Sequence, residues 1–369
     1  MLLIISMKKD ENNYLCKKKN IYKEKNSRIY YLDYLRIFCS FFVILIHVSA
    51  NYYNKSALNS YNWKISYYYN RLSRFSVSNF FMISGALFLN RNLTYKIIFT
   101  KYIKNIFIHL ILWSIIYSLI NINLSTLNIK MKLLEIIKGH YHLWYLYATI
   151  GIYIITPFLR EIAKNELLLK YFIFLYFVIL FVIPNYIYLL YYSKDIYQLL
   201  QYLNSVFRLN TLSVNIFYFI IGHYLNKKKT EKKIRIFFYI IGFTSFIFTS
   251  IIAYNFAIIK KQKMKHFSSI YFDIFFVSIS VFIFFKDNFN NLKINKKQNN
   301  IVQYISKLTF GIYLIHPLIM ETIVQYLNLF NLHINIIFLI PMLNIFIFLL
   351  SLIISMIIKN IPFIGNYLI

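Results

Sequence analysis

Glycine and proline are scarce in this chain, which has seven glycines and five prolines in 369 residues. These residues form most of the tight turns of loop-rich soluble proteins, so their scarcity argues against a soluble fold of this size. Cysteine is scarcer still, because Cys16 and Cys39 are the only two. One lies in a lysine-rich leader and the other in an apolar run, and such a pair does not indicate a disulfide framework.

Acidic residues are also few: 12 Asp and Glu stand against 41 Lys and Arg, and the formal net charge is +29. A large basic surplus is typical of proteins that bind nucleic acid. Here the basic residues lie in short clusters between apolar runs, an arrangement that the positive-inside rule of membrane proteins explains. We therefore expect the lipid bilayer, and no nucleic acid, as a partner of this chain.

Apolar residues are abundant, since 59% of the chain is hydrophobic and 14% is charged. Apolar runs close to membrane-spanning length recur from one end to the other, which predicts an all-α, polytopic membrane protein. About ten transmembrane helices are expected, over Leu35–Tyr53, Phe75–Leu89, Ile103–Ile122, Leu143–Leu159, Tyr171–Tyr192, Leu212–Leu225, Ile236–Ile259, Ile270–Phe285, Leu308–Leu327 and Asn335–Ile358.

The charge pattern divides the chain into three parts. Residues 1–28 contain eight Lys or Arg against three Asp or Glu and lack apolar periodicity, which predicts a basic cytosolic tail. Residues 29–360 are the predicted transmembrane domain, and residues 361–369 a short C-terminal tail. With the N-terminus inside, Lys and Arg favour the cytosolic segments by roughly two to one, which predicts a multi-pass protein of the cell membrane with both termini in the cytosol.

The first apolar run carries three ionisable residues, Asp33, Arg36 and His47. An ionisable residue within a membrane segment is costly and is by default a functional-site hypothesis. On an ideal helix Asp33 and Arg36 share a face, and His47 returns to that face about 16 Å deeper. The spacing predicts an ion pair at the membrane surface and an imidazole near the bilayer centre. That imidazole is a candidate general base; the alternative is a histidine that packs by hydrogen bonding to a neighbouring helix.

Two lysines open the third run. Lys101 and Lys104 are three residues apart on one helical face and are expected at the depth of Arg36. Together these cations would form a rim for an anionic cytosolic ligand such as a phosphorylated carrier. The alternative is a positive-inside anchor without a ligand.

Further polar residues lie in other runs. His316 is expected near mid-depth in the ninth run, and a second buried histidine favours a polar chamber between helices. Ser84-Gly85 is predicted to allow close helix packing, and Trp144 to lie in an aromatic belt. His140 and His142 are two residues apart and would not share a helical face, so no metal site is predicted.

Several short strings follow one another along the chain: Leu32-Asp-Tyr-Leu-Arg-Ile-Phe38 with His47 eleven residues after the arginine, Phe80-Phe-Met-Ile-Ser-Gly-Ala-Leu87, Trp113-Ser-Ile-Ile-Tyr117, His142-Leu-Trp-Tyr-Leu-Tyr147 followed by Ile155-Thr-Pro-Phe-Leu159, and Phe310-Gly-Ile-Tyr-Leu-Ile-His-Pro317. As an ordered set, they resemble acyltransferase family 3, the integral membrane O-acyltransferases of cell-envelope polysaccharides. The branch they resemble most includes the enterobacterial common antigen O-acetyltransferase.

The resemblance implies acyl transfer from a cytosolic acyl-coenzyme A, most often acetyl-CoA, to a sugar hydroxyl of a cell-surface polysaccharide or its lipid-linked precursor. Acyl-CoA is then a co-substrate, and no bound cofactor is expected. His47 matches the essential histidine of the family and Arg36 the arginine of its first-helix motif, with Asp33 beside it. The family's Arg-x-x-Arg pattern is here Lys101-x-x-Lys104, which keeps the charge but loses the planar grip on phosphate.

The predicted site therefore has a catalytic part, a donor-binding part and a possible pocket. These consist, in that order, of His47 and Asp33; of Arg36, Lys101 and Lys104; and of Ser84, Trp144, Tyr313 and His316. Two other classes of protein are alternatives. A carrier or polysaccharide exporter would move its substrate without consuming acyl-CoA, and a structural membrane subunit would use the same polar residues only for packing.

Overall fold

The computed structural model describes residues 28–91, 93–120, 129–183, 213–259, 261, 272–290, 295–329, 334–362 and 365–369. Every regular element within these ranges is helical, which confirms the predicted all-α class for the described part of the chain. Residues 1–27 of the predicted basic tail and residues 184–192 of the predicted fifth span lie outside the described residues.

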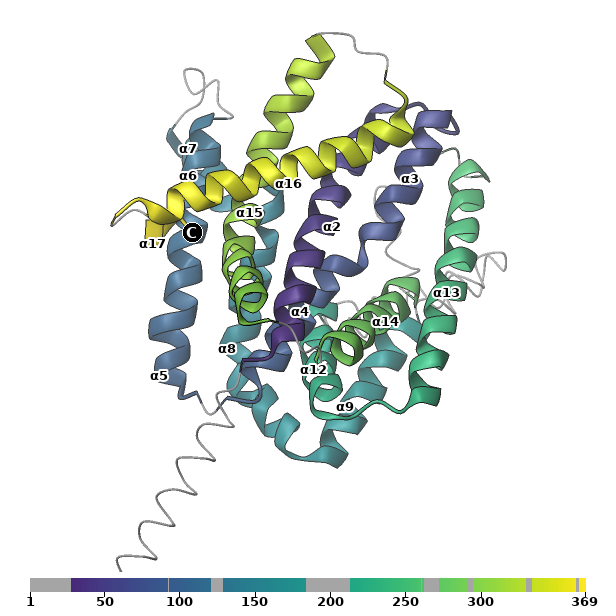
Figure 1. The fold of residues 1–369 in the computed structure, drawn as a ribbon, viewed down its shortest axis with the longest axis vertical. Helices are drawn as coiled ribbons and strands as arrows, with labels where there is room; N and C mark the ends of the chain where they lie inside the picture. The colour runs from purple at the N-terminus through teal and green to yellow at the C-terminus, as the bar shows by residue number, and fades with distance from the viewer. Residues whose placement is uncertain are drawn as a thin grey trace, which may run out of the picture.

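The helix α2 (Tyr30–Lys55) runs through the middle of the bundle (Figure 1). Leu35, Cys39 and Val48 on it are 0% exposed, so neighbouring helices cover it along its length. The hydroxyl of Ser49 donates to the carbonyl of Leu45 at 2.5 Å, which satisfies a buried polar group where no water is at hand. The helix packs against α3 (Tyr61–Ser73), α4 (Phe75–Phe88), α14 (Phe272–Phe289), α15 (Lys296–Leu329) and α16 (Ile336–Asn360).

Further helices complete the described bundle. One continuous helical stretch consists of α5 (Tyr95–Ile97), the π-helix η1 (Ile98–Ile103) and α6 (Lys104–Ile120). The others are α7 (Ile129–Lys138), the 3₁₀ turn η2 (Tyr141–Leu143), α8 (Trp144–Lys164), α9 (Glu166–Phe177), the π-helix η3 (Val178–Val182), α12 (Val214–Lys227), α13 (Lys232–Ile259) and α17 (Gly365–Leu368).

Six helical stretches of the described residues are long and apolar enough to cross a membrane. Other predicted runs form shorter helices: α4 and α12 have 14 residues each, fewer than the ~20 that usually span a bilayer. The total of about ten spans therefore stays a prediction. The six stretches are Tyr30–Lys55, Tyr95–Ile120, Tyr141–Lys164, Lys232–Ile259, Lys297–Tyr326 and Ile336–Asn360.

A buried ion pair joins α3 to α14. The guanidinium of Arg71 donates to Asp273 Oδ2 at 2.6 Å and to Thr249 Oγ1 of α13 at 2.9 Å. The Arg71 and Asp273 side chains are 4% and 2% exposed. An unpaired charge would be energetically costly at this buried position. Arg71 is therefore used to link α3, α13 and α14.

The end of the described chain packs against α6. The indole Nε1 of Trp113 donates to the carbonyl oxygen of Leu368 at 3.0 Å, and Ile369 is 8% exposed. Residues 365–369, which fall in the predicted short C-terminal tail, are thus part of the packed bundle.

Two glycines bring the backbones of α4 and α12 into contact. A methyl group on Gly85 would overlap the carbonyl of Phe219, and one on Gly222 would overlap the backbone of Met82. The close packing predicted at Ser84-Gly85 is confirmed for the glycine, because only a residue without a side chain fits there.

We expect Gly85→Ala to destabilise the protein by about 1–3 kcal/mol, because the added methyl group has no space and the two helices must separate. Gly151→Ala on α8 is the matched control, since nothing lies within 4 Å of the added Cβ. Thermal unfolding of the detergent-solubilised variants measures the difference. Equal behaviour of the two variants would contradict the backbone contact.

Candidate active site

A cavity of about 250 Å³ lies beside α2. Side chains of four helical segments line it, and those of α2 and α15 recur at helical spacing. The lining residues are Arg36, Ser40, Val43 and His47 of α2; Val77, Phe80, Ile83 and Ser84 of α4; His142, Trp144 and Tyr145 of η2 and α8; and Ser306, Lys307, Thr309, Phe310, Tyr313 and His316 of α15.

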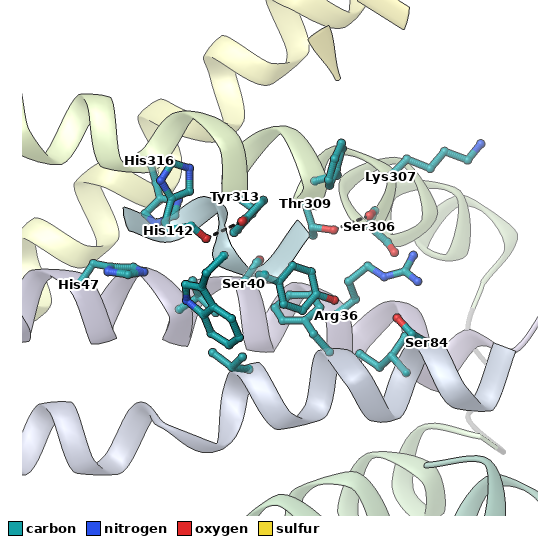
Figure 2. A pocket seen from close by; sticks show the side chains of 17 residues that line it. Arg36, Ser40, His47, Ser84, His142, Ser306, Lys307, Thr309, Tyr313 and His316 are labelled. Carbon is teal, nitrogen blue, oxygen red and sulfur yellow. Dashed lines mark hydrogen bonds between the residues drawn. The ribbon is translucent and has the colours of Figure 1, made fainter. Parts of the chain in front are cut away.

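The cavity has two chemically different ends (Figure 2). His47, His142 and His316 gather at one end, which we call the histidine end. Arg36 and Lys307 lie at the other, which we call the cationic end. Eleven residues of α2 separate Arg36 from His47, or about three helical turns, as the sequence spacing predicts.

At the cationic end, Arg36 is half-buried and faces the cavity. Among the described residues it has no hydrogen bond or ion pair, in contrast to Arg71, which is bonded to Asp273 and Thr249. Lys307 on α15 is exposed and lines the same end. Lys307 also has no hydrogen bond or ion pair within the described part of the chain, and two such cations in one cavity are suited to an anionic ligand.

Asp33 does not pair with Arg36, and that prediction is wrong. Its carboxylate accepts two hydrogen bonds from Arg28, at 2.7 and 3.0 Å, and a third from the hydroxyl of Ser306 at 2.6 Å. Arg28 precedes the helix, so its side chain can fold back over the first turn, which a helical wheel does not represent. Asp33 is 5% exposed and does not line the cavity.

Lys101 and Lys104 lie on η1 and at the start of α6, and both are exposed. Neither lines the cavity, so the structure does not bring them into the lining beside Arg36. Lys307 occupies that place. The residues predicted as a possible pocket, by contrast, all line the cavity: Ser84, Trp144, Tyr313 and His316.

At the histidine end, three imidazoles from three segments approach one another. The ring centroids of His47 and His316 are 5.2 Å apart, and those of His142 and His316 are 5.7 Å apart. His142 and His316 are 1% and 0% exposed, while His47 is half-buried. Among the described residues, no group of three His, Cys, Asp or Glu side chains is arranged to hold a metal ion.

The helix around Pro317 is held by hydrogen bonds that help to fix His316. A proline has no amide hydrogen, so it interrupts the hydrogen-bond ladder of α15. The hydroxyl of Tyr117 inserts there: it donates to the carbonyl of Leu314 at 2.7 Å and accepts from the amide of Leu318 at 3.3 Å. One turn earlier, the hydroxyl of Tyr313 donates to the carbonyl of His142 at 2.7 Å and so joins α15 to η2.

Sequence reasoning missed His142, Lys307, Ser306 and Thr309 as site residues. A signal was present: Ser306, Thr309, Tyr313 and His316 recur every three or four residues, which marks a polar stripe on one helical face. A polar stripe within an apolar run indicates that the stripe faces a cavity or another polar surface.

Comparison with known proteins bears on the chemistry of this cavity. No curated protein and no solved structure shows significant similarity to the chain. The model of one protein family, described as an acyltransferase domain, matches residues 29–359 and so covers every residue that lines the cavity. The chain therefore belongs to acyltransferase family 3 and is a membrane acyltransferase.

Proposed function

We propose that the protein transfers an acyl group, acetyl in the simplest case, from a cytosolic acyl-CoA to a sugar hydroxyl of a cell-surface polysaccharide or its lipid-linked precursor. The observation that carries this proposal is one cavity that connects Arg36, which has no partner among the described residues, to a histidine about three turns away on the same helix. The sequence resemblance to the enterobacterial common antigen branch supports the sugar acceptor.

The cationic end is the proposed site for the donor. Coenzyme A is polyanionic, and Arg36 offers a planar fork of donors that matches a phosphate group in two places. Lys307 adds a second charge at the exposed mouth of the same end. Lys101 and Lys104, exposed and outside the lining, would contribute only weak, solvent-screened attraction.

The histidine end is the proposed site of the chemistry. Neutral His47 takes the proton of the acceptor hydroxyl while the hydroxyl oxygen attacks the thioester carbonyl carbon. The tetrahedral intermediate then collapses: the carbon–sulfur bond breaks, and the imidazolium returns the proton to the leaving thiolate. The products are an ester and free coenzyme A, so no proton or electron is left over and no further cofactor is needed.

Asp33 supports this site without touching a reactant. Its carboxylate holds the hydroxyl of Ser306, the residue immediately before Lys307, and so joins the start of α2 to α15. We therefore assign the residue a positioning role at the cationic end, in place of the catalytic role predicted from the sequence. Family membership also argues against the exporter and scaffold alternatives.

His47→Ala should lower acyl transfer by about 10²–10⁴-fold, the usual contribution of a general base. Transfer by the wild type should also fall as pH decreases, because protonated His47 cannot accept the hydroxyl proton. The measurement is incorporation of radiolabelled acetyl groups from acetyl-CoA into envelope glycan, in membranes with and without the protein. His109→Ala is the control, because His109 is buried on α6 and lies outside the cavity lining. Full activity of a folded His47→Ala variant would refute the proposal.

Arg36→Ala should raise KM for acetyl-CoA by about 10–100-fold, which corresponds to the loss of a charge-assisted hydrogen bond. Lys307→Ala should raise it less, because its ammonium group is exposed. The double variant Lys101→Ala/Lys104→Ala should change it by less than about threefold. A larger effect of the double variant than of Arg36→Ala would show that the donor binds elsewhere.

A further inference from the structure

A row of three side chains leads from the periphery of the bundle to the histidine end. Glu321 of α15 is 35% exposed, and its Oε1 lies 3.2 Å from Nε2 of His140. Nδ1 of His140 lies 2.9 Å from Nδ1 of His142. Of the three residues, only His142 lines the cavity. The chemistry proposed for His47 uses none of them.

His140 is held firmly in this row. Its ring stacks on that of Tyr117, with the centroids 4.1 Å apart and the planes at 10° to each other. Tyr117 is itself fixed by the two hydrogen bonds of its hydroxyl to α15. His140 has an extended backbone just before η2. Its ring can therefore fold back towards His142, although the two residues are only two positions apart in the sequence.

With Glu321 ionised and His140 neutral, the contacts determine which nitrogen carries each proton. An ionised carboxylate only accepts hydrogen bonds, so Nε2 of His140 must donate to Glu321. In neutral His140, Nδ1 is then bare and accepts. Nδ1 of His142 must therefore be the donor of the bond between the two rings. A neutral His142 that is protonated on Nδ1 has a bare Nε2, and this atom belongs to the ring that lines the cavity.

His316 reaches the same state by another route. Its Nδ1 lies 3.1 Å from the carbonyl oxygen of Ile312, which can only accept, so in the neutral ring Nδ1 donates and Nε2 is bare. Nε2 of His142 and Nε2 of His316 are both buried, and neither has a hydrogen-bond partner among the described residues. Buried acceptors without a donor are costly, so this end of the cavity suits a ligand that brings O–H groups.

We propose that the histidine end is the acceptor subsite, in which Glu321 and His140 fix the tautomer of His142 so that its Nε2 accepts a hydrogen bond from a polyhydroxy acceptor. This inference rests on the proposed acyl transfer. His142 binds a hydroxyl group beside the one that reacts, and His47 alone removes the reacting proton. Glu321 and His140 are positioning residues, because they act only through His142.

The first test reads the tautomer directly. Full-length protein with ¹⁵N-labelled histidine is placed in lipid bilayers, and His142→Asn identifies the His142 signals in nitrogen NMR spectra. In the wild type, we expect Nδ1 of His142 protonated and Nε2 unprotonated. Glu321→Ala should populate the opposite tautomer, because nothing then fixes the proton of His140. A wild-type His142 with its proton on Nε2 would overturn the inference.

The second test measures acetyl transfer, as the radiolabel that envelope glycan takes up from acetyl-CoA in native membranes. Glu321→Ala should lower labelling about tenfold, as for other groups that orient a functional histidine. KM for acetyl-CoA should stay within about twofold, since the cationic end is untouched. Glu321→Gln should restore most of the labelling because its amide oxygen can still accept from His140. Glu161→Ala, at an exposed carboxylate on α8, is the control for a lost charge.

The outcomes separate the two proposals. Absence of any acetyl-CoA-dependent labelling by the wild type would overturn the proposed function, whatever the NMR spectra show. Wild-type labelling that is equally strong in Glu321→Ala would overturn the acceptor subsite alone. Equal losses in Glu321→Ala and Glu321→Gln would also count against it, because the tautomer argument requires that the variant with an acceptor oxygen be rescued.

Discussion

Lipid offers no hydrogen bonds, so a polar side chain within the bundle must find a partner in the protein or face a cavity. The two arginines Arg71 and Arg36 illustrate the two solutions. Arg71 is paired with Asp273 and Thr249 and joins three helices. Arg36 has no such partner among the described residues and faces the cavity. The same constraint explains why the polar residues of α2 and α15 converge on one place.

Much of the arrangement of these polar residues follows from helical periodicity, which can be recognised in the sequence. The all-α class, the limits of α4 and the common face of Arg36 and His47 could be predicted, because each depends on residues of one helix. The partner of Asp33 could not, because Arg28 lies before the helix and Ser306 far along the chain. The number of spans is equally hard to predict, because helices of 14 residues need neighbours to be accommodated in a bilayer.

The histidine pair shows a different limit of sequence reasoning. His140 and His142 would lie on different faces of a regular helix, so their spacing argues against cooperation. In the structure, His140 is extended and His142 lies in a 3₁₀ turn, and their Nδ1 atoms are 2.9 Å apart. The start of a helix is where spacing rules fail, because the backbone there is not yet helical. Residues at such a boundary are judged better from their chemistry than from their periodicity.

The backbone contacts of Gly85 with Phe219 and of Gly222 with Met82 have a consequence for the cavity wall. Main-chain atoms set the distance of α4 from α12, so the position of α4 does not depend on the side chains of its opposite face. That face carries Val77, Phe80 and Ile83 into the lining. The sizes of these three side chains can therefore change while the backbone of α4 stays in place. The fold thus separates the placement of α4 from the shape of the cavity that it borders, so one substitution on this face can reshape the cavity while the rest of its wall stays where it is.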